Sequence, residues 1–161
     1  MKALDPLAVS PSVVLYRPEI PHNTGAVGRL CLATGAALHL IGPLGFSLDD
    51  KWVRRAGLDY WNEVNVRCWP DLDALRAGPA KGRRMWFFST KADVSLWEIR
   101  FEPDDFLVFG PESRGLPESL LEDNRRYCVT IPMRARATRS LNLATSVGLA
   151  LYETLRQQHG E

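Results

Sequence analysis

The chain has 161 residues, the usual size of one domain and enough to bury one ordinary core. Its hydrophobic fraction of 45% and charged fraction of 24% are typical of a soluble globular protein and exclude a disordered one. The formal net charge of +1 excludes a global field that would attract nucleic acid, so a polyanionic partner would need a local basic patch.

Short apolar runs alternate with helical patterns along the chain. The expected strands cover residues 12–16, 37–41, 63–68, 84–88, 106–109 and 127–131. The expected helices cover residues 24–34, 49–56, 70–76, 116–121 and 140–158. Strands that alternate with helices form parallel sheets with helices on both faces. The sequence therefore predicts a single α/β domain with a mostly parallel sheet.

Several expected helix ends carry residues that favour a cap. Asn23 is the expected N-cap of the first helix, and Gly35 is its expected C′ residue. Gly57 is expected to end the second helix. Either Thr138 or Ser140 is expected to cap the last helix.

The last expected helix is apolar on two sides. One stripe consists of Leu141, Ala144, Gly148, Leu151 and Leu155, and the other of Leu143, Val147 and Ala150. A helix that is apolar on two sides has to be buried on two sides. The second cover is either another part of the same domain or a second subunit, and the pattern leaves both open.

Common cofactor and nucleophile motifs are missing. The sequence has no G-x-G-x-x-G after its first expected strand and no P-loop. Residues 110–115 do not have nucleophile-elbow spacing, because two residues separate the first glycine from Ser113. The histidines form no H-x-x-x-H pair, and His39, inside an apolar strand, is interpreted as structural. These features disfavour a Ser-His-Asp hydrolase and a metalloenzyme.

Cellular location is indicated by the cysteines and the apolar runs. The three cysteines, Cys31, Cys68 and Cys128, are widely spaced, and no two of them form a C-x-x-C pair. This spacing favours a reduced cytoplasmic protein without a disulfide framework or a zinc site. The N-terminus lacks the apolar core of a signal peptide. The longest early stretch without charges is broken by glycines and Pro43, so no membrane span is expected.

Two segments place polar residues at strand ends. Residues 18–29 follow a strand and open a helix, which puts Asn23 and Arg29 near a strand-end crevice. The alternative for this segment is a helix cap followed by a solvated arginine. Residues 109–117 leave a charge-free strand through a turn with two glycines, two prolines and Glu112, which permits close approach of a ligand. The alternative here is a rigid turn.

The third unusual segment is the loop that leads into the last helix. The window 124–152 contains five arginines and no acidic residue, a local asymmetry that suits phosphate contacts. The pairs Arg54-Arg55 and Arg83-Arg84, with Lys81, are candidates to extend this basic patch, although each alone is usually a solvated face.

Three motifs, in this order, resemble those of a known family. They are N-x-G-x-x-x-R from Asn23, F-G-P-E-x-x-G-L-P from Phe109, and I-P-M followed by R-S-L-N-L from Ile131. Together they are similar to the motifs of the SPOUT RNA methyltransferases, specifically the TrmH-type ribose 2′-O-methyltransferases. Further similar segments at 15–21, 45–51 and 54–60 are closest to the short, single-domain TrmL subfamily of tRNA (cytidine/uridine-34-2′-O)-methyltransferases.

The resemblance implies a fold, a cofactor and partners. It implies one SPOUT methyltransferase domain over residues 1–161, with a core at about 13–156, whose C-terminal part forms a deep trefoil knot. It implies S-adenosylmethionine as methyl donor, S-adenosylhomocysteine as product, and no metal. The implied partners are the anticodon stem-loop of tRNA and a second copy of the chain, in a homodimer whose site lies near the interface.

The resemblance also assigns roles to residues. The implied catalytic residues are Arg29, Asn23, Glu112, Ser140 and Asn142. The implied cofactor contacts are Phe88, Gly110, Ile131, Met133, Ser140, Leu141 and Asn142. The implied RNA contacts are Arg29, Arg134, Arg136, Arg139 and Tyr152. Because a guanidinium is effectively always charged, we expect Arg29 to hold the ribose phosphate and stabilise a developing alkoxide rather than act as a base.

Two alternative functions stay open at this point. One is methylation of another RNA, such as ribosomal RNA, by the same chemistry. The other is a non-catalytic RNA-binding or assembly factor that keeps the pocket without turnover.

Overall fold

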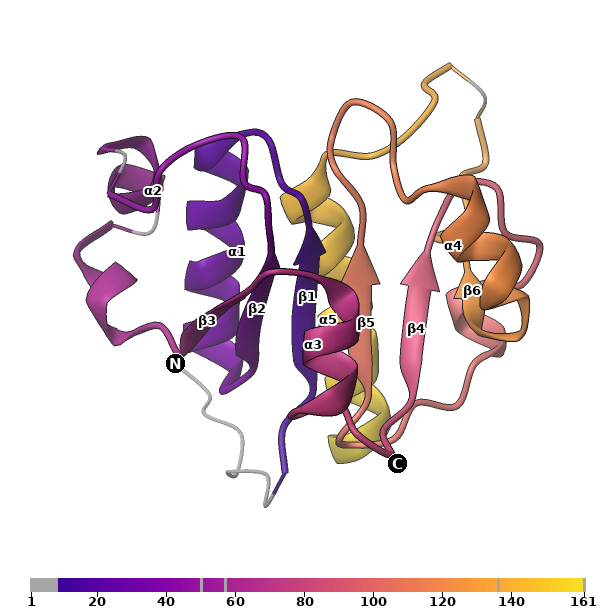
Figure 1. Ribbon diagram of the computed structural model, residues 1–161. Helices are drawn as coiled ribbons and strands as arrows, with labels where there is room; N and C mark the ends of the chain where they lie inside the picture. Colours follow the sequence, from indigo (N-terminus) through magenta and orange to yellow (C-terminus); the bar gives the residue numbers. More distant parts are fainter. Residues whose placement is uncertain (1–8, 50, 57, 136, 161) are drawn as a thin grey trace.

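Six short strands form one sheet whose order is β3-β2-β1-β5-β4-β6 (Figure 1). The computed structural model describes residues 9–49, 51–56, 58–135 and 137–160. The strands are β1 (Ser12–Tyr16), β2 (Ala37–Ile41), β3 (Val66–Trp69), β4 (Met85–Phe88), β5 (Phe106–Phe109) and β6 (Cys128–Val129). Every strand pairing in these ranges is parallel, which confirms the predicted α/β class.

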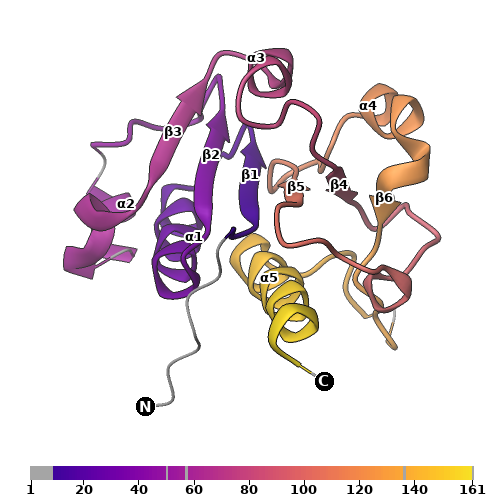
Figure 2. The ribbon, with the colours of Figure 1, turned by 90° about the horizontal axis from the view of Figure 1, so that it is seen from below.

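Helices cover both faces of the sheet, as predicted. They are α1 (Pro21–Thr34), α2 (Lys51–Ala56), α3 (Leu72–Ala77), α4 (Glu118–Asp123) and α5 (Leu143–His159). Three short 3₁₀ turns join them: η1 (Leu58–Glu63), η2 (Leu96–Glu98) and η3 (Arg125–Tyr127). Viewed along the strands in Figure 2, α1 and α5 lie on one face, and α3 and α4 lie on the other.

Alternate residues of each central strand enter two separate cores. In β1, Val13 and Leu15 pack in the cluster that includes residues of α1 and α5, whereas Val14 packs in the cluster that includes α3. All three side chains are fully buried. Burial on both faces explains why this strand is apolar throughout rather than alternating.

At two helix starts, the structure shows a different cap from the one expected. Helix α1 begins at Pro21 with Ile20 at its N-cap, so the prediction that Asn23 caps it is wrong. Helix α5 is capped by Asn142, whose side chain accepts a hydrogen bond from the Thr145 N–H at 3.2 Å, so the prediction of Thr138 or Ser140 is also wrong. Of the two helix ends that were expected at a glycine, one is confirmed.

Gly35 ends α1 as predicted, in the left-handed conformation with φ of 75°. The expected stop at Gly57 lies outside the described residues.

Three strands are shorter than expected, of which β4 differs only in starting at Met85 rather than Arg84. The segment 63–68 begins in η1, and β3 starts only at Val66. The segment 127–131 supplies only the two residues of β6, because Tyr127 belongs to η3 and Thr130 forms an isolated bridge with Ser95. Among the shorter helices, α3 starts at Leu72 and α4 at Glu118, two residues later than predicted in each case.

Helix α5 is buried mainly by its own chain. From both apolar stripes, the buried residues are Leu143, Val147, Ala150, Leu151 and Leu155. The helix packs against α1 and β5. A second subunit is therefore not needed to cover these stripes. The large apolar side chains that α5 leaves exposed are Leu149 (47%) and Tyr152 (51%).

His39 is structural, as predicted. Its side chain is buried in β2, and its Nδ1 accepts a hydrogen bond from Trp69 Nε1 at 3.0 Å. Burial, together with the charge of Arg67, lowers the pKa of His39 from 6.5 to about 4. The imidazole is thus neutral at neutral pH and joins β2 to β3.

A buried carboxylate ties together the amino ends of the central strands. Asp105 is fully buried and accepts hydrogen bonds from Arg84 Nε at 2.9 Å and from Trp86 Nε1 at 2.8 Å. It also accepts the backbone N–H of Glu102 at 2.8 Å. The neighbouring Asp104 pairs with Arg83. The carboxylates at this end are therefore engaged by protein donors.

All three cysteines are free, which agrees with the prediction of no disulfide framework. None of the helices in the described ranges combines the length and apolar character that crossing a membrane requires.

Candidate active site

A cavity of about 440 Å³ opens at the carboxyl ends of β4, β5 and β6. All seven predicted cofactor contacts line it: Phe88, Gly110, Ile131, Met133, Ser140, Leu141 and Asn142. Asn23, Glu112 and Arg139 also line it. The carboxyl edge of a parallel sheet is where such crevices are expected, because the connecting loops diverge there.

Apolar side chains form part of the cavity wall. The rings of Phe88 and Phe109 stack with their centroids 4.6 Å apart and their planes within 13°. Both phenylalanines are buried, and both line the cavity. Ile131, Met133 and Leu141 add partly buried surface. Polar side chains make up about half of the lining, so the cavity combines an apolar wall with polar groups that can orient a small organic ligand.

The loop after β5 folds back tightly on itself. A Cβ atom on Gly110 would lie 2.2 Å from the backbone N of Leu116, so only glycine fits there. Gly115 has φ of 69°, and its N–H donates to the Pro111 carbonyl at 2.9 Å. At Gly110 and Gly115, this loop therefore lines the cavity with backbone alone.

Glu112 caps helix α1 from the other side of the site. Its carboxylate accepts the backbone N–H of Glu19 at 2.8 Å and that of Ile20 at 3.1 Å. It also accepts a hydrogen bond from Asn23 Nδ2 at 3.4 Å. Helix α1 has no capping side chain at its own N-cap, so Glu112 supplies the negative group that a helix N-terminus favours.

A hydrogen bond then joins this cap to the start of α5. Asn142 Nδ2 donates to Asn23 Oδ1 at 3.1 Å, while Asn142 Oδ1 accepts from the Thr145 N–H. Asn23 is buried, with 6% of its surface exposed. Asn23, Glu112 and Asn142, taken from three distant segments, therefore form one connected group at the cavity, as their sequence motifs predicted.

Two cations at the cavity were not singled out from the sequence. Lys91 follows β4, and Arg114 lies in the loop after β5; both are exposed and line the cavity with Arg139. Lys91 Nζ also lies 3.5 Å from Glu118 Oε1. Their position in the sequence could have indicated them, because Lys91 and Arg114 each follow the carboxyl end of a central strand by a few residues.

Arg29 does not line this cavity. It is exposed on α1, and within the described part of the chain no hydrogen bond or ion pair engages its side chain. Because α1 begins at Pro21, Arg29 lies about two turns into the helix. Its predicted meeting with the other site residues is not achieved inside one chain.

Arg134 and Tyr152 line a second groove, of about 620 Å³, beside the first. Leu149 and Trp97 also line this groove, and 73% of the Trp97 surface is exposed. Arg136 lies outside the described residues.

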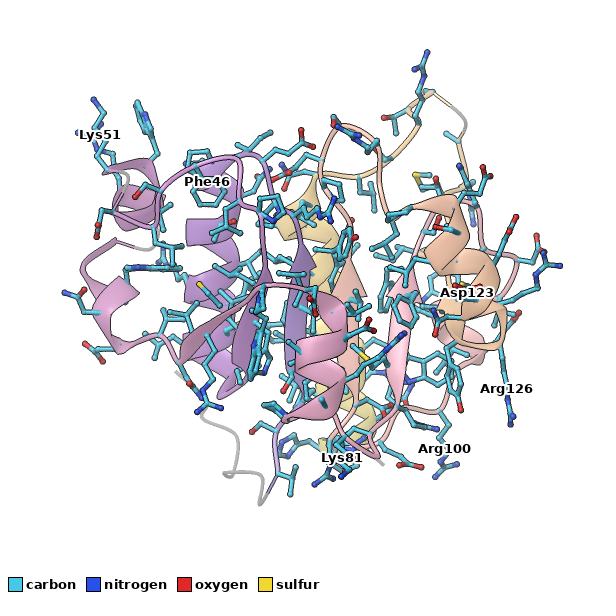
Figure 3. The ribbon with its side chains drawn as sticks, in the orientation of Figure 1. Phe46, Lys51, Lys81, Arg100, Asp123 and Arg126 are labelled. Carbon is cyan, nitrogen blue, oxygen red and sulfur yellow. The ribbon has the colours of Figure 1, made fainter. Side chains whose placement is uncertain are left out.

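The proposed extensions of the basic patch differ in position. Lys81 and Arg100 lie at the opposite edge of the molecule, near the amino ends of the strands (Figure 3). Arg83 and Arg84 pair with Asp104 and Asp105 at that edge. The prediction that Lys81, Arg83 and Arg84 extend the patch at the site is therefore wrong. On α2, Lys51 and Arg55 flank the exposed ring of Trp52, each 5.3 Å from its centroid.

Comparison with known proteins gives a consistent result. The model of the SpoU rRNA Methylase family matches residues 10–152. A tRNA (cytidine(34)-2′-O)-methyltransferase of Methylovorus glucosotrophus is 47% identical over 146 residues, which are 90% of this chain and 94% of the relative.

Two solved structures share the fold. One, concerned with the 2-OH methylation of C/U34 on tRNA, has a TM-score of 0.89 and 47% identity, over 95% of this chain and 99% of that one. The other is the SpoU methyltransferase AviRb from Streptomyces viridochromogenes in complex with the cofactor AdoMet (S-adenosylmethionine). It has a TM-score of 0.81 and 26% identity, over 96% of this chain and 60% of that one.

Proposed function

Because the chain belongs to the SpoU rRNA methylase family, we propose that it methylates the ribose 2′-hydroxyl of the wobble nucleotide, cytidine or uridine 34, of tRNA. The observation that carries this proposal is the joining of Asn23, Glu112 and Asn142 at one cavity. This chain also matches a named tRNA (cytidine(34)-2′-O)-methyltransferase over nearly the whole length of both proteins.

The cavity suits S-adenosylmethionine. Its volume of about 440 Å³ lies in the range of ~300–1,000 Å³ that is usual for small-molecule sites. Phe88, Ile131 and Leu141 would hold the adenine and the methionine chain, and backbone groups around Gly110 and Met133 would supply hydrogen bonds. The cofactor, when bound, supplies an electrophilic sulfonium methyl group. The chain's own contribution is to place the ribose and to exclude water.

The polar group at the rim has a positioning role. Glu112 already accepts three N–H donors, so we assign it to holding Asn23 and the start of α1 rather than to removing the proton. Ser140 and Asn142 line the cavity from the segment before α5. We assign them to the part of the rim that the ribose would face. Correct placement of two reactants accounts for much of the acceleration in a transfer reaction of this kind.

The arginines are assigned to the RNA. Arg139 lines the cavity, and Arg134 and Tyr152 line the adjoining groove, so the RNA would run from one to the other. Arg29 does not line the cavity within one chain. In a homodimer whose site lies near the interface, it would hold the phosphate beside the target ribose and stabilise the developing alkoxide. The 2′-hydroxyl proton leaves through that phosphate or solvent.

We also propose that the C-terminal segment is threaded as a deep trefoil knot. After β6, at the edge of the sheet, residues 130–135 and 137–142 lie on a path that returns over the carboxyl ends of β4 and β5 to α5, which packs behind β5 (Figure 1). This return path supports the proposal. A crystal structure in which the segment passes outside the preceding loops would contradict it.

A homodimer is proposed through the apolar part of the second groove, at Trp97 and Leu149, beside the part at Arg134 that is assigned to the RNA. Trp97 and Leu149 are both exposed there, and neighbouring exposed apolar side chains mark surfaces that bind a partner. Light scattering of the full chain is expected to give twice the monomer mass, and Leu149→Glu is expected to give the monomer. A monomeric parent chain would contradict the dimer.

The activity is tested by methyl transfer from labelled S-adenosylmethionine to tRNA that lacks its own wobble methylation, followed by mapping of the label. Label on the ribose of nucleotide 34 is the expected result. Label at another nucleotide would assign the chain to a different RNA target. Cofactor binding without transfer to any RNA would favour a non-catalytic binding factor.

A further inference from the structure

A pair of residues outside those assigned above joins two loops of the site. Glu19 Oε1 accepts hydrogen bonds from the Ser113 N–H at 3.0 Å and from Ser113 Oγ at 2.7 Å. In return, the Glu19 N–H donates to Glu112 Oε2 at 2.8 Å. The loop before α1 and the loop after β5 thus each give and receive a carboxylate hydrogen bond. We call this arrangement the Glu19–Ser113 clasp.

The clasp fixes the residue next to it. Ser113 directly follows Glu112, so fastening Ser113 to Glu19 limits the directions that the Glu112 side chain can take. Glu19 does not itself line the cavity, whereas Glu112 and Ser113 do. Any effect of Glu19 on the reaction therefore has to pass through the loop that it holds.

The segment that carries Glu19 is held from its other side as well. The Gly45 N–H donates to the Pro18 carbonyl at 3.0 Å, and a Cβ on Gly45 would lie 3.0 Å from the Glu19 Cα. Arg17, two residues earlier, has φ of 49°, which is uncommon for a residue other than glycine. The segment is thus confined between the loop after β2 and the loop after β5.

Charge favours the same arrangement. The hydrogen bonds from the Ser113 hydroxyl and N–H, with a further contribution from the charge of Arg114, lower the pKa of Glu19 below its ordinary value. The ionised carboxylate is the form that accepts both hydrogen bonds, and charged acceptors make the stronger ones.

We propose that Glu19, acting through Ser113, is a positioning residue that sets the orientation of Glu112 and of the loop 110–116 for methyl transfer; this rests on the proposed function. Ser113 is exposed, so a threonine has room for its extra methyl group and keeps the hydroxyl. Glu122, an exposed carboxylate on α4, supplies a matched control.

The experiment is a double-mutant cycle on the full chain. Glu19→Ala and Ser113→Ala are each expected to lower kcat about tenfold, because either change removes the hydrogen bonds to a charged acceptor that hold the loop next to Glu112. The RNA KM is expected to stay within about threefold, and the double variant to lose no more than either single one. Ser113→Thr is expected to restore most of the rate, and Glu122→Ala to leave it unchanged.

Two results would overturn the proposal: unchanged kcat in Glu19→Ala, or single losses that multiply in the double variant. Thermal unfolding of each variant is recorded, and Ser113→Ala, an exposed position, keeps the test valid if Glu19→Ala fails to fold. If the parent chain transfers no methyl group, the proposed function fails by itself. The clasp is then tested by calorimetry with S-adenosylmethionine. Both single variants should bind the cofactor more weakly by the same factor, and the double variant should bind it no more weakly than either. Unequal or additive changes would refute the clasp.

Discussion

Gly110 shows how much one residue can constrain the cavity. We expect Gly110→Ala to weaken S-adenosylmethionine binding at least about tenfold and to destabilise the fold by ~1–3 kcal/mol, because the added Cβ would force the loop backbone apart. Calorimetry and thermal unfolding measure the two effects. Gly148→Ala is the control, since its Cβ would only make ordinary contacts with the side chain of Leu30, at 3.6 Å from Cδ1 and 4.0 Å from Cδ2. Unchanged binding in Gly110→Ala would mean that the loop does not touch the cofactor.

Arg29 is the residue whose assigned role depends most on the RNA. Arg29→Ala is expected to lower the rate of methyl transfer by about a hundredfold or more, the range in which loss of one charge-stabilising donor falls. Cofactor affinity should change only several-fold, because Arg29 does not line the cavity. Single-turnover kinetics and calorimetry separate these effects. Arg100→Ala, at the opposite edge of the molecule, is the control (Figure 3). Retention of most of the rate in Arg29→Ala would remove it from the reaction.

At the scale of elements, the junction of β2 and β3 is expected to make stability depend on pH. His39 has a folded pKa of about 4 against an ordinary value of 6.5, so between these values the unfolded chain binds more protons. The stability that neutral His39 contributes is fully present above pH 6.5 and is lost as the pH falls toward about 4. From about pH 7 to about pH 4.5 the loss is about 2 kcal/mol, allowing for partial solvent screening.

Urea unfolding at both pH values measures this loss. In His39→Gln, the side chain no longer titrates but can still accept a hydrogen bond from Trp69 Nε1. Over the same pH range, this variant should therefore lose about 2 kcal/mol less stability than the parent. His159→Gln, exposed at the end of α5, should behave like the parent. Identical pH dependence in the parent and His39→Gln would contradict the low pKa.

The elements also show which features a sequence pattern can reveal. Apolar runs predicted the strands, because each central strand is buried on both faces. Its residues are therefore apolar throughout, whichever helices cover the two faces. Motif order predicted that Asn23, Glu112 and Asn142 meet, because parallel strands deliver their following loops to one edge. The start of α1 was misplaced because its cap is Glu112, some ninety residues away. Lys91 and Arg114 were missed because a single loop cation has no local pattern.

At the scale of the whole molecule, the net charge of +1 leaves RNA binding to local cations. Arg139→Ala is expected to weaken tRNA binding and to reduce the slope of log affinity against log salt by about 0.7–0.9, the change for one lost phosphate contact. Fluorescence anisotropy across a salt series measures it. Lys81→Ala, at the opposite edge, should leave both values unchanged (Figure 3). An unaltered slope in Arg139→Ala would place that arginine away from phosphate.

The buried Asp105 network lies at the amino ends of β4 and β5, and the cavity lies at their carboxyl ends. The groups that hold the central strands in register are thus separated from the loops that meet the substrate by the length of the sheet. Mutations that alter substrate choice can therefore accumulate in those loops without disturbing the strand register that Asp105 holds. This separation would let descendants of the same scaffold diverge in the RNA they modify.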